Sequence, residues 1–182
     1  MSKCIRFCVS GSFSPADSAT DWSADLASGD FENATLTLSG VLDDAGRQSD
    51  KVDLGLVRPR EWDLYGCVDL TGESPTAGAT VEYYWAPSDS ATQANSNTAG
   101  NSGADADAPG GAVPSGLTLD EFLDQCIFIG ALVVSNDAAV FNAYVDRFAP
   151  PSRWGQLIVV NRTGDTFEAD DVEAHQLLKP VG

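Results

Sequence analysis

Short segments in which apolar and polar residues alternate recur along most of this chain. Residues 3–10, KCIRFCVS, are an example, because Ile5, Phe7 and Val9 fall on one side and more polar or smaller residues on the other. Alternation with a period of two predicts a β-strand that has one face in the core. The other segments with an alternating or continuous apolar pattern are 34–42, 51–57, 61–70, 79–87, 126–135, 140–150, 155–164 and 170–180.

Two of these segments predict which side chains face the core. In residues 51–57, KVDLGLV, the inward positions are Val52, Leu54 and Leu56. In residues 79–87, ATVEYYWAP, alternation places Val81, Tyr83 and Trp85 on the inner face and Tyr84 on the opposite face. Tyr84 is therefore the best candidate for an exposed aromatic contact.

One short helix is expected, within residues 116–125, GLTLDEFLDQ. Thr118 and Glu121 have the spacing of a capping box, and Leu117 is placed to pack against Phe122 as a hydrophobic staple. Strands and helices do not alternate regularly along the chain, which argues against a parallel α/β sheet. We therefore expect an all-β fold: an antiparallel β-sandwich or jelly roll of about eight or nine strands with one short helix.

The length of 182 residues suits one sandwich domain over residues 1–182, with residues 1–30 as a possible N-terminal arm. Residues 88–116 form a long polar excursion without aromatic residues, Leu or Ile. A loop of this composition becomes ordered only when backbone hydrogen bonds hold it on its own domain or on a neighbouring chain. Of the two, we expect the neighbouring chain.

The charge balance limits the partners. The chain has 27 acidic and 10 basic residues, a net charge of −17, and no cluster of Lys or Arg. Such a field repels nucleic acid and an anionic membrane surface, and it is typical of a soluble protein or a salt-rich habitat. The N-terminus lacks the pattern of a secretory leader, so we expect synthesis in a cytoplasm.

No catalytic or metal-binding motif stands out. The single histidine, His175, lies in the last predicted strand, away from any nucleophile elbow. The four cysteines contain no C-x-x-C pair and are interpreted as small buried apolar residues. Asp105 and Asp107 faintly resemble a calcium loop, but the full spacing is missing, so they are interpreted as solvated loop carboxylates. We expect no enzyme activity, cofactor or metal.

The aromatic residues allow two interpretations. Exposed indole rings bind sugars by stacking, whereas in an all-β protein most tryptophans belong to the core or to interfaces. The second interpretation is favoured. Trp154 is the tryptophan that we expect to be exposed, because it follows APPSR, a proline-rich turn that can present a ring outward. The tryptophans are Trp22, Trp62, Trp85 and Trp154.

Three phrases resemble small structural proteins of tailed bacteriophages: VEYYWAPS with the polar excursion after it, LDQCIFIGALVVS, and RWGQLIVVNRTGDTFEADDVEAHQLLKP. They cover most of residues 79–180. The resemblance implies a head decoration or cement protein with a jelly-roll body. Proteins of this family bind the outer capsid surface, are commonly trimeric, and hold neighbouring major capsid subunits together.

From this resemblance we expect a virion protein whose partners are the major capsid protein and further copies of itself in a homotrimer. The candidate contact residues are Tyr84, Asp105, Asp107 and Trp154. Two alternatives remain: a tail or spike component that binds host carbohydrate, and a small hydrolase that uses His175 or an acidic pair.

Overall fold

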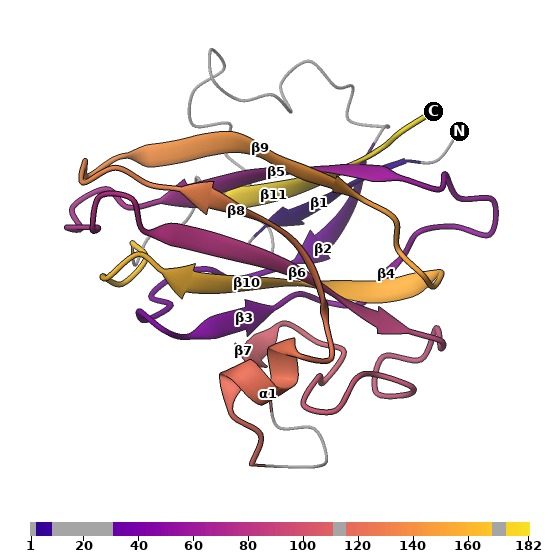
Figure 1. Cartoon of the computed structure of the whole chain (residues 1–182). Helices are drawn as coiled ribbons and strands as arrows, with labels where there is room; N and C mark the ends of the chain where they lie inside the picture. Colours follow the sequence, from indigo (N-terminus) through magenta and orange to yellow (C-terminus); the bar gives the residue numbers. More distant parts are fainter. Residues whose placement is uncertain (1–2, 9–30, 111–115, 169–173) are drawn as a thin grey trace.

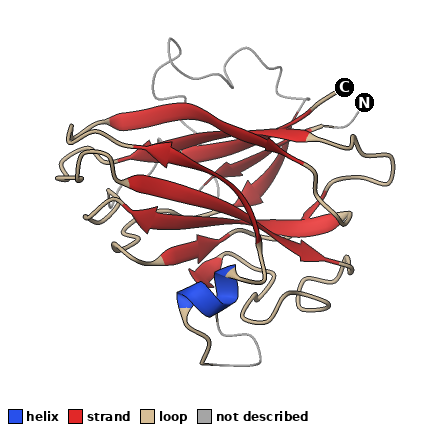
Figure 2. Cartoon of the chain, in the orientation of Figure 1, coloured by secondary structure: helices blue, strands red, loops and turns tan. Residues whose placement is uncertain are grey.

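Two β-sheets pack face to face in the computed structural model, which describes residues 3–8, 31–110, 116–168 and 174–182 (Figures 1 and 2). The five-stranded sheet has the order β2-β1-β11-β5-β9, and the six-stranded sheet has the order β7-β3-β10-β6-β8. The short strand β4 also pairs with β10. The predicted all-β sandwich is thus confirmed.

The described strands number eleven, more than the eight or nine predicted, because β3, β4 and β7 are only two or three residues long. Neighbouring strands are antiparallel except for β1 and β2, which run parallel. The strands are β1 (Cys4–Cys8), β2 (Phe31–Thr35), β3 (Gly46–Gln48), β4 (Val52–Asp53), β5 (Trp62–Asp69), β6 (Thr80–Ser88), β7 (Ala106–Ala108), β8 (Ile127–Val133), β9 (Val140–Phe148), β10 (Trp154–Arg162) and β11 (His175–Pro180).

The main core lies between the two sheets and follows the predicted alternation on β6. Val81, Tyr83 and Trp85 are all fully buried. Trp85 packs against Phe148, with ring centroids 5.6 Å apart. It also lies so close to Gly155 that a Cβ at that position would come within 2.4 Å of the indole. The strand therefore needs glycine at this point.

Two predicted strands differ from those observed. The 34–42 segment keeps Leu36 and Leu38 buried, but β2 ends at Thr35, and beyond it the Thr37 amide donates to the Asp105 carboxylate. In the 51–57 segment the prediction that Leu56 faces the core is wrong, since its exposed fraction is 82%. Gly55 adopts a φ of +92° and donates its amide to Asp53, and this turn breaks the alternation.

Helix α1 (Leu119–Leu123) has the predicted capping box, with Thr118 as N-cap and reciprocal hydrogen bonds to Glu121. It covers part of the outer face of the six-stranded sheet, beside β7 and β3 (Figure 1). Phe122 is fully buried there with Ile158 and Val160 of β10. This packing forms a second, smaller core on the opposite side of the sheet from the main one.

The polar excursion is held by its own domain, so the expectation that a neighbouring chain orders it is wrong for its described part, 88–110. Residues 106–108 form β7, which pairs with β3. The ammonium group of Lys51 donates to the carbonyl oxygens of Ser90, Thr92 and Asn95 at 2.8–3.2 Å. Backbone groups in the described part of the excursion thus find partners within the same chain.

The predicted N-terminal arm is wrong for its first residues. Cys4–Cys8 form β1, which lies between β2 and β11 inside the five-stranded sheet. Ile5 and Phe7 are fully buried, as their alternation predicts. The rest of the proposed arm, residues 9–30, lies outside the described residues.

Candidate functional site

Exposed apolar side chains gather at two places on this acidic molecule. The first lies on β8, which is the edge strand of the six-stranded sheet and has the sequence IFIGALV, without a charged residue. Phe128 and Val133 are 55% and 64% exposed. An uncharged edge strand with exposed large side chains is the kind of surface that natural sheets usually protect.

A β-bulge places these two side chains on the same face. Phe128 pairs with Tyr84 and Val133 pairs with Thr80, with a register shift between them. Directly opposed residues of an antiparallel pair point to the same side of the sheet. Although they are five positions apart, Phe128 and Val133 therefore share the outer face with Tyr84 and Ala131. We name these four residues the β8 strip.

Tyr84 lies on the outer face, as the alternation predicts, and is half-buried rather than fully exposed. Its ring meets Phe128 edge to face, with centroids 5.1 Å apart, and its hydroxyl donates to the Glu82 carboxylate at 3.0 Å. Burial, together with Glu82, raises the pKa of Tyr84 to about 12. The phenol stays neutral at physiological pH and supports the Phe128 ring in its exposed position.

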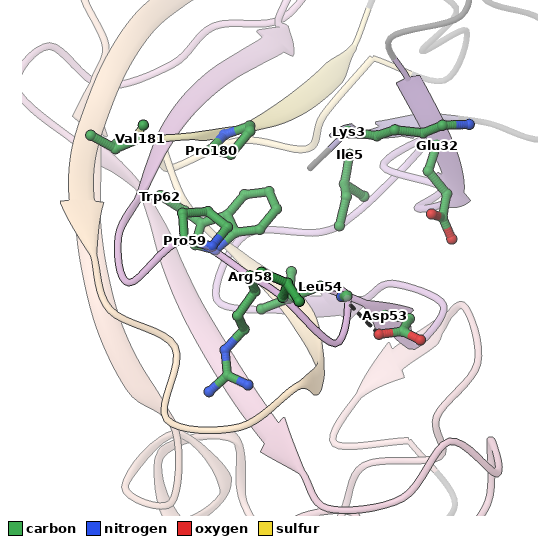
Figure 3. A pocket seen from close by; sticks show the side chains of 13 residues that line it. Lys3, Ile5, Glu32, Asp53, Leu54, Arg58, Pro59, Trp62, Pro180 and Val181 are labelled. Atoms are coloured by element: carbon green, nitrogen blue, oxygen red, sulfur yellow. Dashed lines mark hydrogen bonds between the residues drawn. The ribbon is translucent and has the colours of Figure 1, made fainter. Parts of the chain in front are cut away.

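The second place is a pocket of about 920 Å³ at one end of the sandwich (Figure 3). One wall comes from the five-stranded sheet and the chain end that follows it, including Ile5, Trp62 and Pro180. The other comes from β4 and the loop after it, with Leu54 and Pro59. This volume and largely apolar lining are within the range of ligand or partner sites.

The loop beside this pocket carries the most exposed large apolar side chains of the described residues. Leu56 is 82% and Val57 is 88% exposed, and Val57 also lines the pocket. Arg58 anchors the loop by donating to the carbonyl oxygens of Pro150 and Pro151 at 3.5 and 3.2 Å. We name residues 55–59 the apolar loop.

Trp154 belongs to a charged cluster of which Asp53 lines the pocket. Arg153 stacks over the Trp154 ring, 4.7 Å from its centroid, and donates through Nε to Asp53 at 2.6 Å. Hydrogen bonding from Arg153, and further from Gly55 and Trp154, lowers the pKa of Asp53 despite its partial burial. One face of the indole is therefore occupied by the guanidinium group, which leaves it less open for stacking on a sugar.

The side chains of Asp105 and Asp107 differ in their exposure to solvent, although the sequence predicts that both are solvated. The side chain of Asp107 is 90% exposed, whereas that of Asp105 is only 15% exposed. Asp105 accepts two hydrogen bonds from Arg47, at 2.9 and 3.0 Å, and two from Thr37. The prediction that Asp105 is solvated is wrong, because this carboxylate holds the excursion on its own domain.

His175 and the four cysteines are the residues that the sequence offered for nucleophilic chemistry or metal binding. His175 is buried within β11, opposite Cys67 of β5, with 6% of its surface exposed. The four cysteines form no disulfide, and the described residues contain no cluster of metal-ligating side chains. Within those same residues, no helix has the length and apolar character needed to cross a membrane.

Sequence reasoning located Tyr84 but missed both apolar surfaces. The β8 strip depends on a bulge, which apolar alternation alone does not reveal. The apolar loop depends on Gly55, and the Asp-x-Gly spacing of Asp53 and Gly55 was the available signal for a turn. The pocket itself joins residues from both ends of the chain, so only the folded structure shows it.

No family model and no curated protein matches the chain. Among solved structures, the clostridial cysteine protease Cwp84 after propeptide cleavage is similar with a TM-score of 0.39 and 13% sequence identity. The match covers 80% of this chain and 38% of the protease chain, so the chain spans well under two thirds of that protein. A likeness at this level carries no inference about activity.

Proposed function

We propose that this chain is a non-enzymatic structural protein that decorates the outer surface of an assembled bacteriophage head and holds neighbouring major capsid subunits together. The observation that carries the proposal is the β8 strip. It exposes Phe128 and Val133, contains no charged residue of its own, and lies beside Glu82 on a molecule with 27 acidic residues. Exposed apolar surface of this kind, framed by polar residues, is typical of protein–protein contacts.

The charge of the whole chain supports the outer rather than the inner surface of a head. A net charge of −17 disfavours contact with packaged DNA. The anchoring of the described part of the excursion, 88–110, also supports a structural role, since an ordered segment loses little conformational entropy when it docks. Binding to the assembled shell stabilises that shell by mass action, and the binding free energies of many copies add together.

A binding experiment with variants on the β8 strip tests the proposal. Heads that lack this protein are mixed with the purified chain, and bound protein is measured after sedimentation. Phe128→Lys places a charge in the centre of the strip and is expected to weaken binding by about tenfold or more, since central aromatic residues dominate interfaces. The matched control is Leu42→Lys, because Leu42 is similarly exposed, at 63%, and lies outside the strip.

If the Phe128→Lys variant and the wild-type chain bind equally well, the β8 strip does not contact the head. If the wild-type chain does not bind heads at all, the proposed decoration function is wrong. The carbohydrate alternative has less structural support, because the Trp62 side chain is buried and one face of the Trp154 ring is covered by Arg153. A glycan array with pure protein separates the two functions, since a decoration protein gives no signal.

A further inference from the structure

The wall of the pocket contains a buried hydrogen-bond donor that no acceptor satisfies. Trp62 lines the pocket and is 1% exposed, and its indole Nε1 has no hydrogen-bond partner among the described residues. Figure 3 shows the Trp62 ring facing the same space as the Ile5 and Leu54 side chains. A buried donor without an acceptor is unfavourable, so an unpaired N–H in the wall of a cavity indicates that a bound molecule supplies the acceptor.

The charged residues of the pocket lining do not offer a buried charge for a ligand. Asp53 is held by Arg153 at 2.6 Å, and Arg58 donates to two backbone carbonyl oxygens. Lys3 and Glu32 also line the pocket, but both are exposed, so water hydrates their charges. A charged ligand group inside the pocket would lose its own hydration without gaining a counter-ion. The lining therefore favours an uncharged ligand.

The remaining lining residues determine the body of the ligand. They are apolar, and one of them, Val57 in the apolar loop, is 88% exposed. A volume of about 920 Å³ is large enough for a small organic molecule. A largely apolar body would remove the aliphatic surface of Val57 and of the pocket walls from water, which favours binding.

We propose that this pocket binds an uncharged, largely apolar small molecule whose oxygen atom accepts a hydrogen bond from the Trp62 indole. The indole nitrogen only donates, so the ligand must carry an acceptor, such as the oxygen of a ketone, ester or ether. Contact with the apolar walls supplies most of the affinity, and the indole N–H selects molecules that carry the acceptor. The pocket is separate from the β8 strip, so the inference does not depend on the proposed function.

Three fluorescent dyes test the ligand class with the full chain. The uncharged ketone 6-propionyl-2-(dimethylamino)naphthalene is the main probe, because its emission shifts to the blue in apolar surroundings. N-phenyl-1-naphthylamine is uncharged and has no oxygen, and 1-anilinonaphthalene-8-sulfonate is an anion. We expect saturable binding of one ketone molecule per chain. The dissociation constant of the anion is expected to be about tenfold higher or more, because its charge finds no buried partner.

Trp62→Phe tests the hydrogen bond, since it keeps an aromatic ring and removes the N–H group. It is expected to raise the dissociation constant of the ketone about three- to tenfold, the usual effect of losing one hydrogen bond, and to change that of the oxygen-free dye less. Trp85→Phe is the matched control, because Trp85 also has a buried, unpaired indole nitrogen but lies outside the pocket lining. Its affinity for the ketone should equal that of the wild-type chain.

Val57→Asp tests the location and does not disturb the core, because Val57 is exposed. It places a carboxylate in the pocket lining and is expected to weaken ketone binding by about tenfold. Leu42→Asp is the matched control at an exposed leucine outside the lining, and it should bind the ketone like the wild-type chain. Circular dichroism spectra verify that all variants are folded. If Trp62→Phe does not fold, the comparison of dyes and Val57→Asp still decide the outcome.

Four results would overturn the inference. The first is a wild-type chain without saturable binding of the ketone, and the second is tighter binding of the anion than of the ketone. The third is a Trp62→Phe variant that binds the ketone like the wild-type chain or loses both uncharged dyes equally. The fourth is a Val57→Asp variant with unchanged affinity. Because head binding is measured separately, a failure here leaves the decoration function standing.

Discussion

At the residue scale, Asp105 fixes the position of the polar excursion. Its carboxylate joins Arg47 of β3 to Thr37, and its amide donates to the Asp50 side chain at 3.0 Å. Burial disfavours the charged form, but the hydrogen bonds from Arg47 and Thr37 outweigh burial and lower the pKa of Asp105. The ionised carboxylate thus stabilises the folded chain.

Asp105→Asn is expected to lower the free energy of unfolding by about 1.5–3 kcal/mol at pH 7, the usual range for hydrogen bonds to a charged group. Asp107→Asn is the control and is expected to change little, because Asp107 is 90% exposed. Urea denaturation of the three proteins measures both effects. Equal stability of the Asp105→Asn variant and the wild-type chain would contradict the anchoring role.

The lowered pKa of Asp105 predicts that the free energy of unfolding depends on pH. Because the pKa of Asp105 is lower in the folded than in the unfolded chain, its stabilisation is complete above about pH 4, where an unfolded aspartate is ionised. It is lost as the pH falls through the folded-state pKa. The difference in unfolding free energy between the wild-type chain and Asp105→Asn should therefore shrink below about pH 4. A constant difference down to pH 2 would contradict this linkage.

Gly155 is the second residue whose identity matters for the core. A methyl group there would lie 2.4 Å from the Trp85 indole, so Gly155→Ala is expected to cost about 1–3 kcal/mol by overpacking. Adding Trp85→Phe removes the part of the ring that clashes and should recover part of that cost. Thermal denaturation of the two single variants and the double variant measures the coupling, and strict additivity would contradict the contact.

At the scale of elements, α1 depends on local signals. Thr118 accepts from the Glu121 amide at 3.3 Å, and its own amide donates to the Glu121 carboxylate at 2.8 Å. Thr118→Ala is expected to lower stability by about 1 kcal/mol, and Thr118→Ser is the control that keeps the cap. Equal unfolding midpoints for the two variants in denaturant would show that the cap does not matter.

The elements show which features a sequence can predict. The capping box and the inner face of β6 follow from short-range spacing, and both are confirmed. By contrast, β3 and β7 are three residues each and exist through pairing with strands far away in the chain. Alternation cannot be seen in three residues, so the polar excursion did not reveal that it contains a strand.

At the scale of the whole molecule, the protein is an acidic sandwich with two separate exposed apolar regions. The β8 strip faces outward from the six-stranded sheet, and the pocket opens at the end of the sandwich near β1, β4 and the last residues of the chain. The sequence predicts partner contacts at Tyr84, Asp105, Asp107 and Trp154. Tyr84 belongs to the β8 strip, Trp154 is joined to the pocket residue Asp53 through Arg153, and Asp105 is engaged within its own domain. Partner contact at these residues stays a prediction.

Decoration of a phage head is tested most directly by the copy number of this protein in purified particles. Quantitative mass spectrometry against the major capsid protein gives that number. On the order of hundreds of copies per particle is the predicted result, because a decoration protein repeats with the symmetry of the shell. A count of about a dozen or fewer would place the protein in the tail or at one vertex, and its absence from particles would contradict the claim.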